Sequence, residues 1–160
     1  MNQQNLADFI WSVADVLRGD FRQSEFGRII LPFTVLRRLE CVLEPTRDKV
    51  RSQYQAMQAS GVDMDLILPA TAGATFYNVS QFALDSVGST STRANLEDYI
   101  AKFSANARQV FEHFAFDGWL AKLETANLLY LVTQKFAAID LHPVDAATEQ
   151  PARRRLQLGA

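Results

Sequence analysis

The sequence predicts an all-α protein, a compact bundle of about six to eight helices with a long irregular connection around residues 60–94. Apolar residues recur every three or four positions through most of the chain, which is the spacing of one helical face. No alternating strand pattern of useful length interrupts them. With 160 residues, of which 48% are hydrophobic and 21% charged, the chain suits one globular core.

Two helices are predicted in the N-terminal third. The first stops near Gly19, and its apolar stripe consists of Leu6, Phe9, Ile10, Val13 and Leu17. The second pattern begins near Gln23 and keeps its phase to Leu43, although Pro32 lies inside it. Because proline removes a backbone donor and crowds the preceding turn, two arrangements fit: one kinked helix, or two helices with Pro32 in the first turn of the second.

A polar helix is predicted next, from about residue 47 to 59. The Glu44-Pro45 pair ends the helix before it, and Thr46 is the candidate N-terminal cap. Gly61 closes the polar helix, since glycine readily adopts the left-handed conformation found at helix ends.

The middle of the chain is predicted to be irregular because it is rich in Gly, Ser and Thr. We expect only one short helix there, at 79–86, with Asn78 or Ser80 as its cap. At most a short extended pair is predicted around 66–77.

Helical periodicity returns at 94–115, with a break predicted near Ser104–Asn106. Asp117 is then predicted to cap a short helix. The last helix, about 125–139, is apolar over more than one face, so we place it at the centre of the bundle. Residues 1–143 therefore form the predicted domain, and 144–160 form a polar tail typical of disorder or of a truncation junction.

Arg37 and Arg38 are predicted to point away from the core. At 100° per residue, the apolar side chains of the second helix group on one side, and Arg37 lies nearly opposite, beside Cys41 and Glu44. An internal alternative is a pair between Arg37 and Glu40, which on a helix surface contributes only a few tenths of a kcal/mol. The arginines are thus either ordinary surface charges or contacts for a partner.

Charge is distributed unevenly, although the net charge is only −2. Residues 18–51 carry eight basic and five acidic side chains, whereas residues 61–100 carry one basic and five acidic. A mildly basic N-terminal third suits phosphate or an acidic partner, and it equally suits a solvated helical surface. The candidate contacts for DNA or a partner are Arg37, Arg38, Arg47, Lys49 and Arg51.

Catalytic chemistry is not predicted within this chain. Its one cysteine, Cys41, permits neither a disulfide nor a CxxC pair, and the two histidines lie far apart without a metal-ligand spacing. His142, which follows the last predicted helix, is expected to interact with that helix's terminal carbonyls instead of the nearby Asp140. The lone thiol and the lack of a signal or spanning segment favour a cytoplasmic protein without membrane contact.

Four stretches of the chain carry a family resemblance. An L-R-G helix end and the segment GRIILPFTVLRRLE lie within NLADFIWSVADVLRGDFRQSEFGRIILPFTVLRRLECVLEPTRDKV. There follow, in order, FYNVSQFAL, NLEDYIAKFSANARQVFEHFAF and LLYLVTQKFAAIDLHP. Together they resemble the N-terminal helical domain of type I restriction–modification methyltransferase (modification, M) subunits over roughly residues 5–143. Two stretches depart from the family: SANARQVF, where it usually has S-P-N, and the tail VDAATEQPARRRLQLGA after DLHP.

The resemblance implies a non-catalytic domain of a DNA adenine-N6 methyltransferase. The parent enzyme would use S-adenosylmethionine in a catalytic domain, whose Asn-Pro-Pro-Phe/Tyr segment and glycine-rich turn this chain lacks, so no cofactor is expected here. The implied partners are duplex DNA, a specificity subunit, a second M subunit, the catalytic domain of the same M subunit and, in addition, a restriction subunit. The domain would help to assemble this complex and close it around DNA. The alternative is a helical protein–protein adaptor without DNA contact.

Overall fold

The computed structural model describes residues 3–143, and its regular elements are all helical. No strand is present in this range, which confirms the predicted all-α class. Two 3-10 turns, Gln23–Glu25 and Glu44–Thr46, flank the second helix. The helices are α1 (Gln3–Leu17), α2 (Phe26–Leu43), α3 (Arg47–Met57), α4 (Met64–Ala72), α5 (Thr92–Ala101), α6 (Ala105–His113), α7 (Phe116–Thr125) and α8 (Leu129–Ala138).

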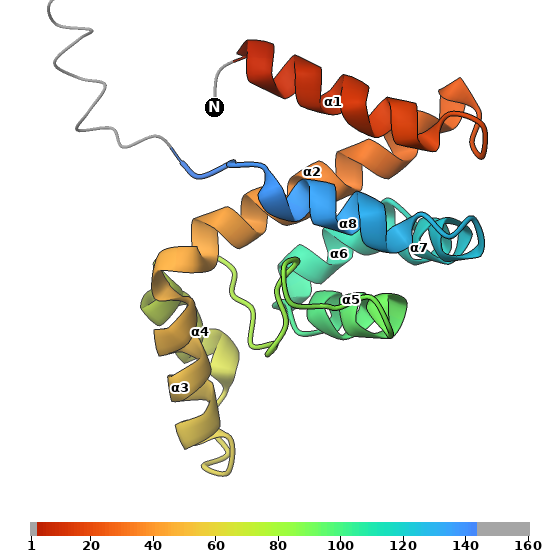
Figure 1. The fold of residues 1–160 in the computed structure, drawn as a ribbon. Coiled ribbons are helices and arrows are strands. Elements are labelled where there is room, and N and C mark those ends of the chain that lie inside the picture. The colour runs from red at the N-terminus through yellow and green to blue at the C-terminus, as the bar shows by residue number, and fades with distance from the viewer. Residues whose placement is uncertain (1–2, 144–160) are drawn as a thin grey trace, which may run out of the picture.

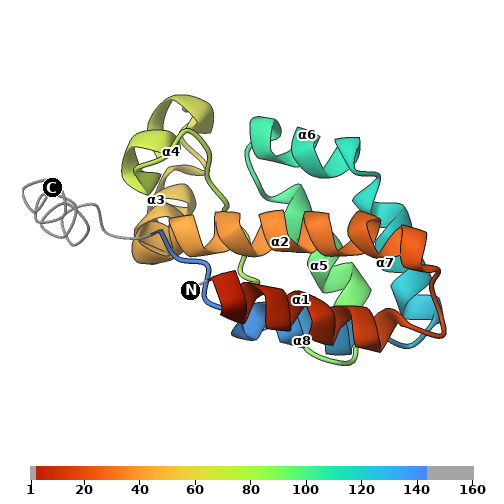
Figure 2. The same ribbon diagram turned by 90° about the horizontal axis from the view of Figure 1, so that it is seen from above.

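The long helix α2 organises the bundle (Figure 1). Helices α1, α7 and α8 all pack against it, and α8 also contacts α5. Helices α3 and α4 pair with each other beyond the C-terminal end of α2 (Figures 1 and 2). Helix α8 contacts α1, α2, α5 and α7, but Tyr130 and Leu131 on its other face are exposed, so the predicted position at the centre of the bundle is wrong.

An aromatic cluster joins the two ends of the sequence. The ring of Phe33, fully buried on α2, stacks on Phe136 of α8 with centroids 5.1 Å apart. Phe116 meets the edge of Phe33 at 4.9 Å, and Phe9 of α1 meets Phe136 at 5.0 Å. Such contacts between aromatic rings stabilise beyond the area they bury. The C-terminal helix is thereby fixed against the N-terminal pair.

Pro32 lies within one uninterrupted helix (Figure 2). Of the two alternatives at this position, the single helix is adopted and the two-helix arrangement is wrong. Pro32 is itself buried with Ile29 and Phe33, so the residues on either side of it face the same core. The burial explains why a proline that removes one helical hydrogen bond is tolerated here.

The predicted irregular region is shorter than expected, because α4 occupies residues where at most an extended pair was predicted. The Asp63 side chain accepts a hydrogen bond from the backbone N–H of Asp65 and caps the helix, and Gly73 closes it in the left-handed conformation (φ 68°). Pro69 lies inside α4 and masked the helical signal. The helix is held by packing on α3, a contact that local sequence does not specify.

The short helix predicted at 79–86 is absent, and this prediction was wrong. The side chains of Asn78 and Ser80, expected to cap a helix, instead accept bonds from backbone N–H groups two residues on, at 2.7 and 3.0 Å. Further along, the backbone N–H of Leu84 donates to the Glu40 carboxylate at 2.9 Å. These polar partners replace helical carbonyls, so the segment follows the surface of the bundle as a loop.

Of two further predicted caps, Thr46 occupies the N-cap position of α3 but makes no capping bond, and Asp117 is not the cap of α7. Thr46 precedes α3, yet its hydroxyl donates to the carbonyl of Ala72 at 2.9 Å, which ties the end of α4 to the start of α3. Asp117 lies in the first turn of α7, and the residue that precedes the helix is Ala115, in the left-handed conformation. The break predicted near residues 104–106 is confirmed as the junction of α5 and α6.

Candidate functional site

Arg37 is a largely buried residue bonded to other parts of the chain, and its predicted outward orientation is wrong. Its side chain is only 12% exposed. The Nε–H group donates to the backbone carbonyl of Ile139 at 2.8 Å, and a terminal nitrogen pairs with the Glu40 carboxylate at 2.6 Å. The internal alternative, the pair between Arg37 and Glu40, is the one that forms. Arg37 thus connects α2 to the chain that leaves α8.

Glu40 is the centre of this buried network. Besides Arg37, its carboxylate accepts hydrogen bonds from the backbone N–H of Leu84 at 2.9 Å and from the Tyr99 hydroxyl at 2.7 Å. Burial, reinforced by the neighbouring carboxylate, raises the pKa of Tyr99 well above its ordinary value, so the hydroxyl stays protonated and donates. One side chain of α2 therefore holds the 78–91 loop and α5 in place.

The C-terminal segment, residues 139–142, covers the face of α2 that was predicted to be solvent-exposed. The Arg38 guanidinium, which remains exposed, donates to the Leu141 carbonyl at 2.6 Å. Cys41 is fully buried, and burial raises the pKa of its thiol, although a backbone hydrogen bond with Leu141 opposes the shift. A helical wheel places Arg37 and Cys41 opposite the first core, but it contains no information about a second chain segment on that side.

His142 links the C-terminal segment to the end of α2. One ring nitrogen, Nδ1, lies 2.6 Å from the Asp140 carboxylate, and the other, Nε2, lies 2.8 Å from the carboxylate of Glu44. Hydrogen bonds to Asp140 and Glu44 raise the pKa of His142, and the bond from His142 lowers the pKa of Asp140. The expected interaction with helix carbonyls is therefore wrong, because two carboxylates compete for the imidazole more strongly.

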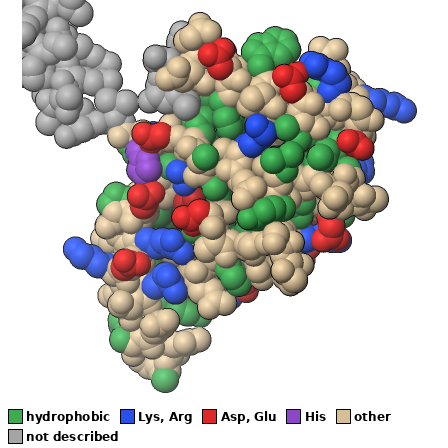
Figure 3. Space-filling view, viewed as in Figure 1, with side chains coloured by type: hydrophobic (Ala, Val, Ile, Leu, Met, Phe, Trp, Pro, Cys, Tyr) green, Lys and Arg blue, Asp and Glu red, His purple; other side chains and the backbone are tan. Residues whose placement is uncertain are grey.

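The three remaining basic candidates lie on α3 and are more accessible. Arg47 has one long contact, at 3.3 Å, from a terminal nitrogen to the carbonyl of Gln81. Within residues 3–143, Lys49 and Arg51 have no ion pair or hydrogen-bonding side-chain partner. Figure 3 shows Lys and Arg side chains gathered, with acidic ones among them, around the junction of α2 and α3.

The basic candidates therefore divide into two groups. Arg37 and Arg38 bond to backbone carbonyls of the C-terminal segment. Lys49 is exposed and Arg51 partly exposed, and neither has a bonded partner among the described residues. Sequence reasoning missed Glu40 as the organiser and His142 as a bridge. The only sequence signals were the three-residue spacing from Arg37 to Glu40 and the proximity of Asp140 to His142.

The described residues provide little for catalysis. No group of three or more His, Cys, Asp and Glu side chains between residues 3 and 143 is placed to hold a metal ion. The Cys41 thiol is buried and its pKa is raised, which opposes the thiolate form needed of a nucleophile. In the same part of the chain, no helix is both long and apolar enough to cross a membrane. What the site offers is ionic and hydrogen-bonding contact.

A known protein family matches most of the chain. The family model described as the HsdM N-terminal domain matches residues 6–136. No curated protein and no solved structure matches the chain. The matched range covers the greater part of α1, all of α2 to α7 and the greater part of α8. It therefore includes Glu40 and the basic side chains of α3.

Proposed function

This chain belongs to the HsdM N-terminal domain family, the N-terminal domains of type I restriction–modification methyltransferase M subunits, and we propose that it acts as their non-catalytic assembly domain. In this role it helps to join the M subunit to the specificity subunit and to close the complex around duplex DNA. Methyl transfer from S-adenosylmethionine to adenine N6 then belongs to the catalytic domain of the parent enzyme. The single observation that carries the proposal is the family match over residues 6–136.

The accessible charge on α3 supports a DNA contact. Lys49 is exposed and Arg51 is partly exposed, and neither has an acidic partner among the described residues. Arg47, on the same face as Arg51 four positions earlier, has only one long hydrogen bond. Such side chains bind phosphates at little cost, because no internal ion pair has to break first.

One observation favours the adaptor alternative. Arg37 and Arg38, which the sequence offered as phosphate contacts, donate to the carbonyls of Ile139 and Leu141. Their guanidinium groups therefore already bond within the domain, and fewer cations are available to bind DNA than the sequence suggested. A domain that contacted only other subunits would need no further basic side chains.

A salt titration distinguishes the two roles. The purified chain is mixed with the specificity subunit of the same system, and assembly is followed by size-exclusion chromatography with light scattering. Binding of the assembled complex to a fluorescent DNA duplex is then measured by anisotropy over a range of salt concentrations. A complex containing this chain is expected to bind more tightly than the specificity subunit alone, with a steeper fall of log K against log salt, because phosphate contacts release counterions.

Two other outcomes would contradict the proposed DNA contact. Assembly with an unchanged salt dependence would assign the chain to the adaptor role. Failure of the chain to assemble with the specificity subunit would contradict both roles.

A further inference from the structure

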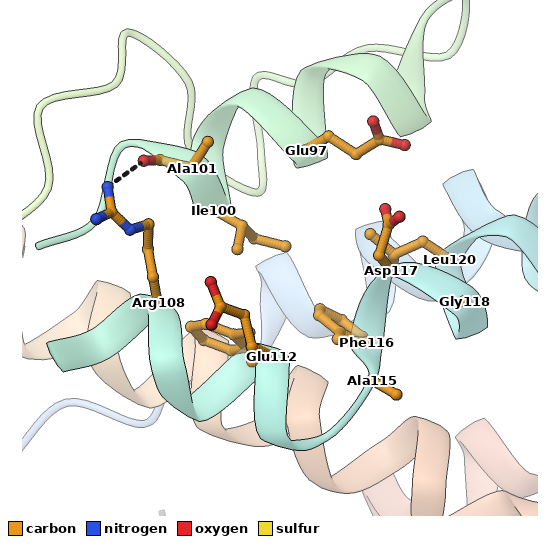
Figure 4. Close-up of a pocket in the computed structure, with 11 residues that line it drawn as sticks. Glu97, Ile100, Ala101, Arg108, Glu112, Ala115, Phe116, Asp117, Gly118 and Leu120 are labelled. Atoms are coloured by element: carbon orange, nitrogen blue, oxygen red, sulfur yellow. Dashed lines mark hydrogen bonds between the residues drawn. The ribbon is translucent and has the colours of Figure 1, made fainter. Parts of the chain in front are cut away.

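A cavity of about 580 Å³ opens between α5, α6 and α7 (Figure 4). Its apolar lining comes from all three helices: Ile100, Phe111, Phe116 and Leu120. Phe111, Phe116 and Leu120 also belong to the buried core, so their positions are fixed by packing. The cavity is thus a preformed depression in the rigid part of the domain, large enough to receive one or two apolar side chains.

Acidic side chains surround the mouth of this cavity. Glu112 on α6 and Asp117 on α7 point toward α5, which carries Glu97 (Figure 4). Glu97 is paired with Arg93 at 2.7 Å, but Glu112 and Asp117 have no ion pair within residues 3–143. The single cation at the mouth, Arg108, donates to the carbonyl of Ala101. With Glu97 paired to Arg93, the two carboxylates of Glu112 and Asp117 face one cation, so the apolar lining is bordered by an excess of negative charge.

We propose that this cavity, hereafter the α5–α7 pocket, docks a protein segment in which an apolar side chain is flanked by Lys or Arg. The apolar side chain would fill the space over Phe111 and Phe116, and the flanking cations would pair with Glu112 and Asp117. Charge complementarity of this kind selects partners and speeds their association. It also excludes DNA as the occupant, because phosphates would face two unpaired carboxylates.

The position of the pocket suits a contact separate from DNA. In both ribbon views α7 lies at the opposite end of the molecule from α3, which carries Lys49 and Arg51 (Figures 1 and 2). A protein segment in the α5–α7 pocket would thus leave the basic surface of α3 accessible. The protein that supplies the segment is the specificity subunit, and this identification rests on the proposed function.

Two kinds of variant test the pocket, one by charge and one by shape. Glu112→Gln combined with Asp117→Asn removes the two unpaired negative charges of the mouth with little change in side-chain size. Gly118→Leu fills the pocket from α7, where an added Cβ meets no atom within 4 Å and the backbone is helical. The matched control is Asp20→Asn with Asp85→Asn, which removes two exposed carboxylates outside the pocket.

Affinity of each variant for the specificity subunit is measured by anisotropy at two salt concentrations, after circular dichroism has shown that each variant is folded. At low salt the charge variant is expected to bind at least about tenfold more weakly than wild type. At high salt the difference from wild type should be smaller, because salt screens the electrostatic attraction in the wild-type protein. Gly118→Leu is expected to bind at least about tenfold more weakly at both salt concentrations. The affinity of the control variant is expected to stay within about twofold of the wild-type value.

Two results would count against the pocket alone, and a third would count against the proposed function. Wild-type binding that both pocket variants retain would remove the pocket from the interface and leave the assembly role intact. Self-association of the chain that the pocket variants abolish would assign the pocket to a second copy. No binding by the wild-type chain would contradict the proposed function itself.

Discussion

The end of α2 and the helix that follows it carry similar charges but use them differently. On α2, the side chain of Arg37 is 12% exposed and bonds to Glu40 and to the C-terminal segment. On α3, Lys49 is exposed and has no ion pair within the described residues. The difference shows that a basic residue on a helix is a candidate ligand contact only if no other part of the chain reaches it first.

The physical basis of the difference is the polar backbone of the C-terminal segment. Residues 139–142 form no helix or strand, so their carbonyls have no regular backbone partners and need donors. Arg37 and Arg38 supply those donors at Ile139 and Leu141. Helix α3 packs mainly on α4. Most carbonyls of α4 already accept hydrogen bonds within that helix, so they do not need the basic side chains of α3, which remain available to solvent.

The largest effect is expected from Glu40→Ala, because three donors depend on this carboxylate. Removing it leaves a terminal nitrogen of Arg37, the backbone N–H of Leu84 and the Tyr99 hydroxyl without this acceptor, while the Nε–H of Arg37 keeps the Ile139 carbonyl. We expect a decrease of about 3–5 kcal/mol in the free energy of unfolding, the cost typical of breaking a buried ionic network. Urea unfolding followed by circular dichroism measures it. Asp48→Ala on the exposed side of α3 is the control, and a Glu40→Ala decrease no larger than the control's would refute the assignment.

A smaller decrease is expected from Arg37→Ala, about 2–3 kcal/mol, because charge-assisted hydrogen bonds to Ile139 and Glu40 disappear while Glu40 keeps two donors. Arg37→Lys should recover only part of this stability, since an ammonium cannot reproduce the planar geometry that reaches both partners. Arg51→Ala is the matched variant on α3 and should change stability by less than about 0.5 kcal/mol. Equal decreases in the free energy of unfolding for Arg37→Ala and Arg51→Ala would contradict the difference proposed between the arginines of α2 and α3.

The His142 bridge predicts a pH dependence of stability. Asp140 and Glu44 raise the pKa of His142 above its ordinary value of 6.5. The other charged groups bonded to this segment are Arg37, which donates to Ile139, and Arg38, which donates to Leu141. Because the folded-state pKa is raised, the stabilisation is fully present below about pH 6.5 and is lost as the pH rises through the folded-state pKa.

The measurement compares wild type with His142→Asn by urea unfolding from pH 5.5 to 8.5. The wild-type advantage is expected to be largest at the acidic end of this range and to shrink toward the alkaline end. His113→Asn, which removes the exposed histidine at the end of α6, is the control and should show no such trend. An advantage that grew with pH would mean that the imidazole stabilises in its neutral form.

The smallest effect on stability is expected on α3. Replacing both Lys49 and Arg51 with alanine should change the free energy of unfolding by less than about 0.5 kcal/mol, since exposed charges without partners contribute little. In the assembled complex, the same double change should reduce the slope of log K for DNA against log salt by about one for each phosphate that is no longer bound. An unchanged slope would remove α3 from the DNA contact.

Most of the helices could be read from the sequence because their apolar periodicity is local. The stripes of α1, α2 and α8, the break between α5 and α6, and the polar helix α3 all follow from spacing and from glycine or proline at the ends. The helix α4 was missed because Pro69 weakened its signal and packing on α3 compensates. The predicted helix at 79–86 failed because the Glu40 carboxylate, 44 positions before Leu84, takes a backbone donor.

The family of the chain and its all-α class were thus determined by the sequence alone, since both are carried by patterns among near neighbours. Which of the five basic candidates bond to distant parts of the chain was decided only by the tertiary structure. A helical wheel specifies which side of α2 Arg37 occupies, but whether that side meets solvent depends on residues 139–142, about a hundred positions away. Because those contacts join distant parts of the chain through backbone carbonyls, which every residue possesses, no local pattern of side chains could have encoded them.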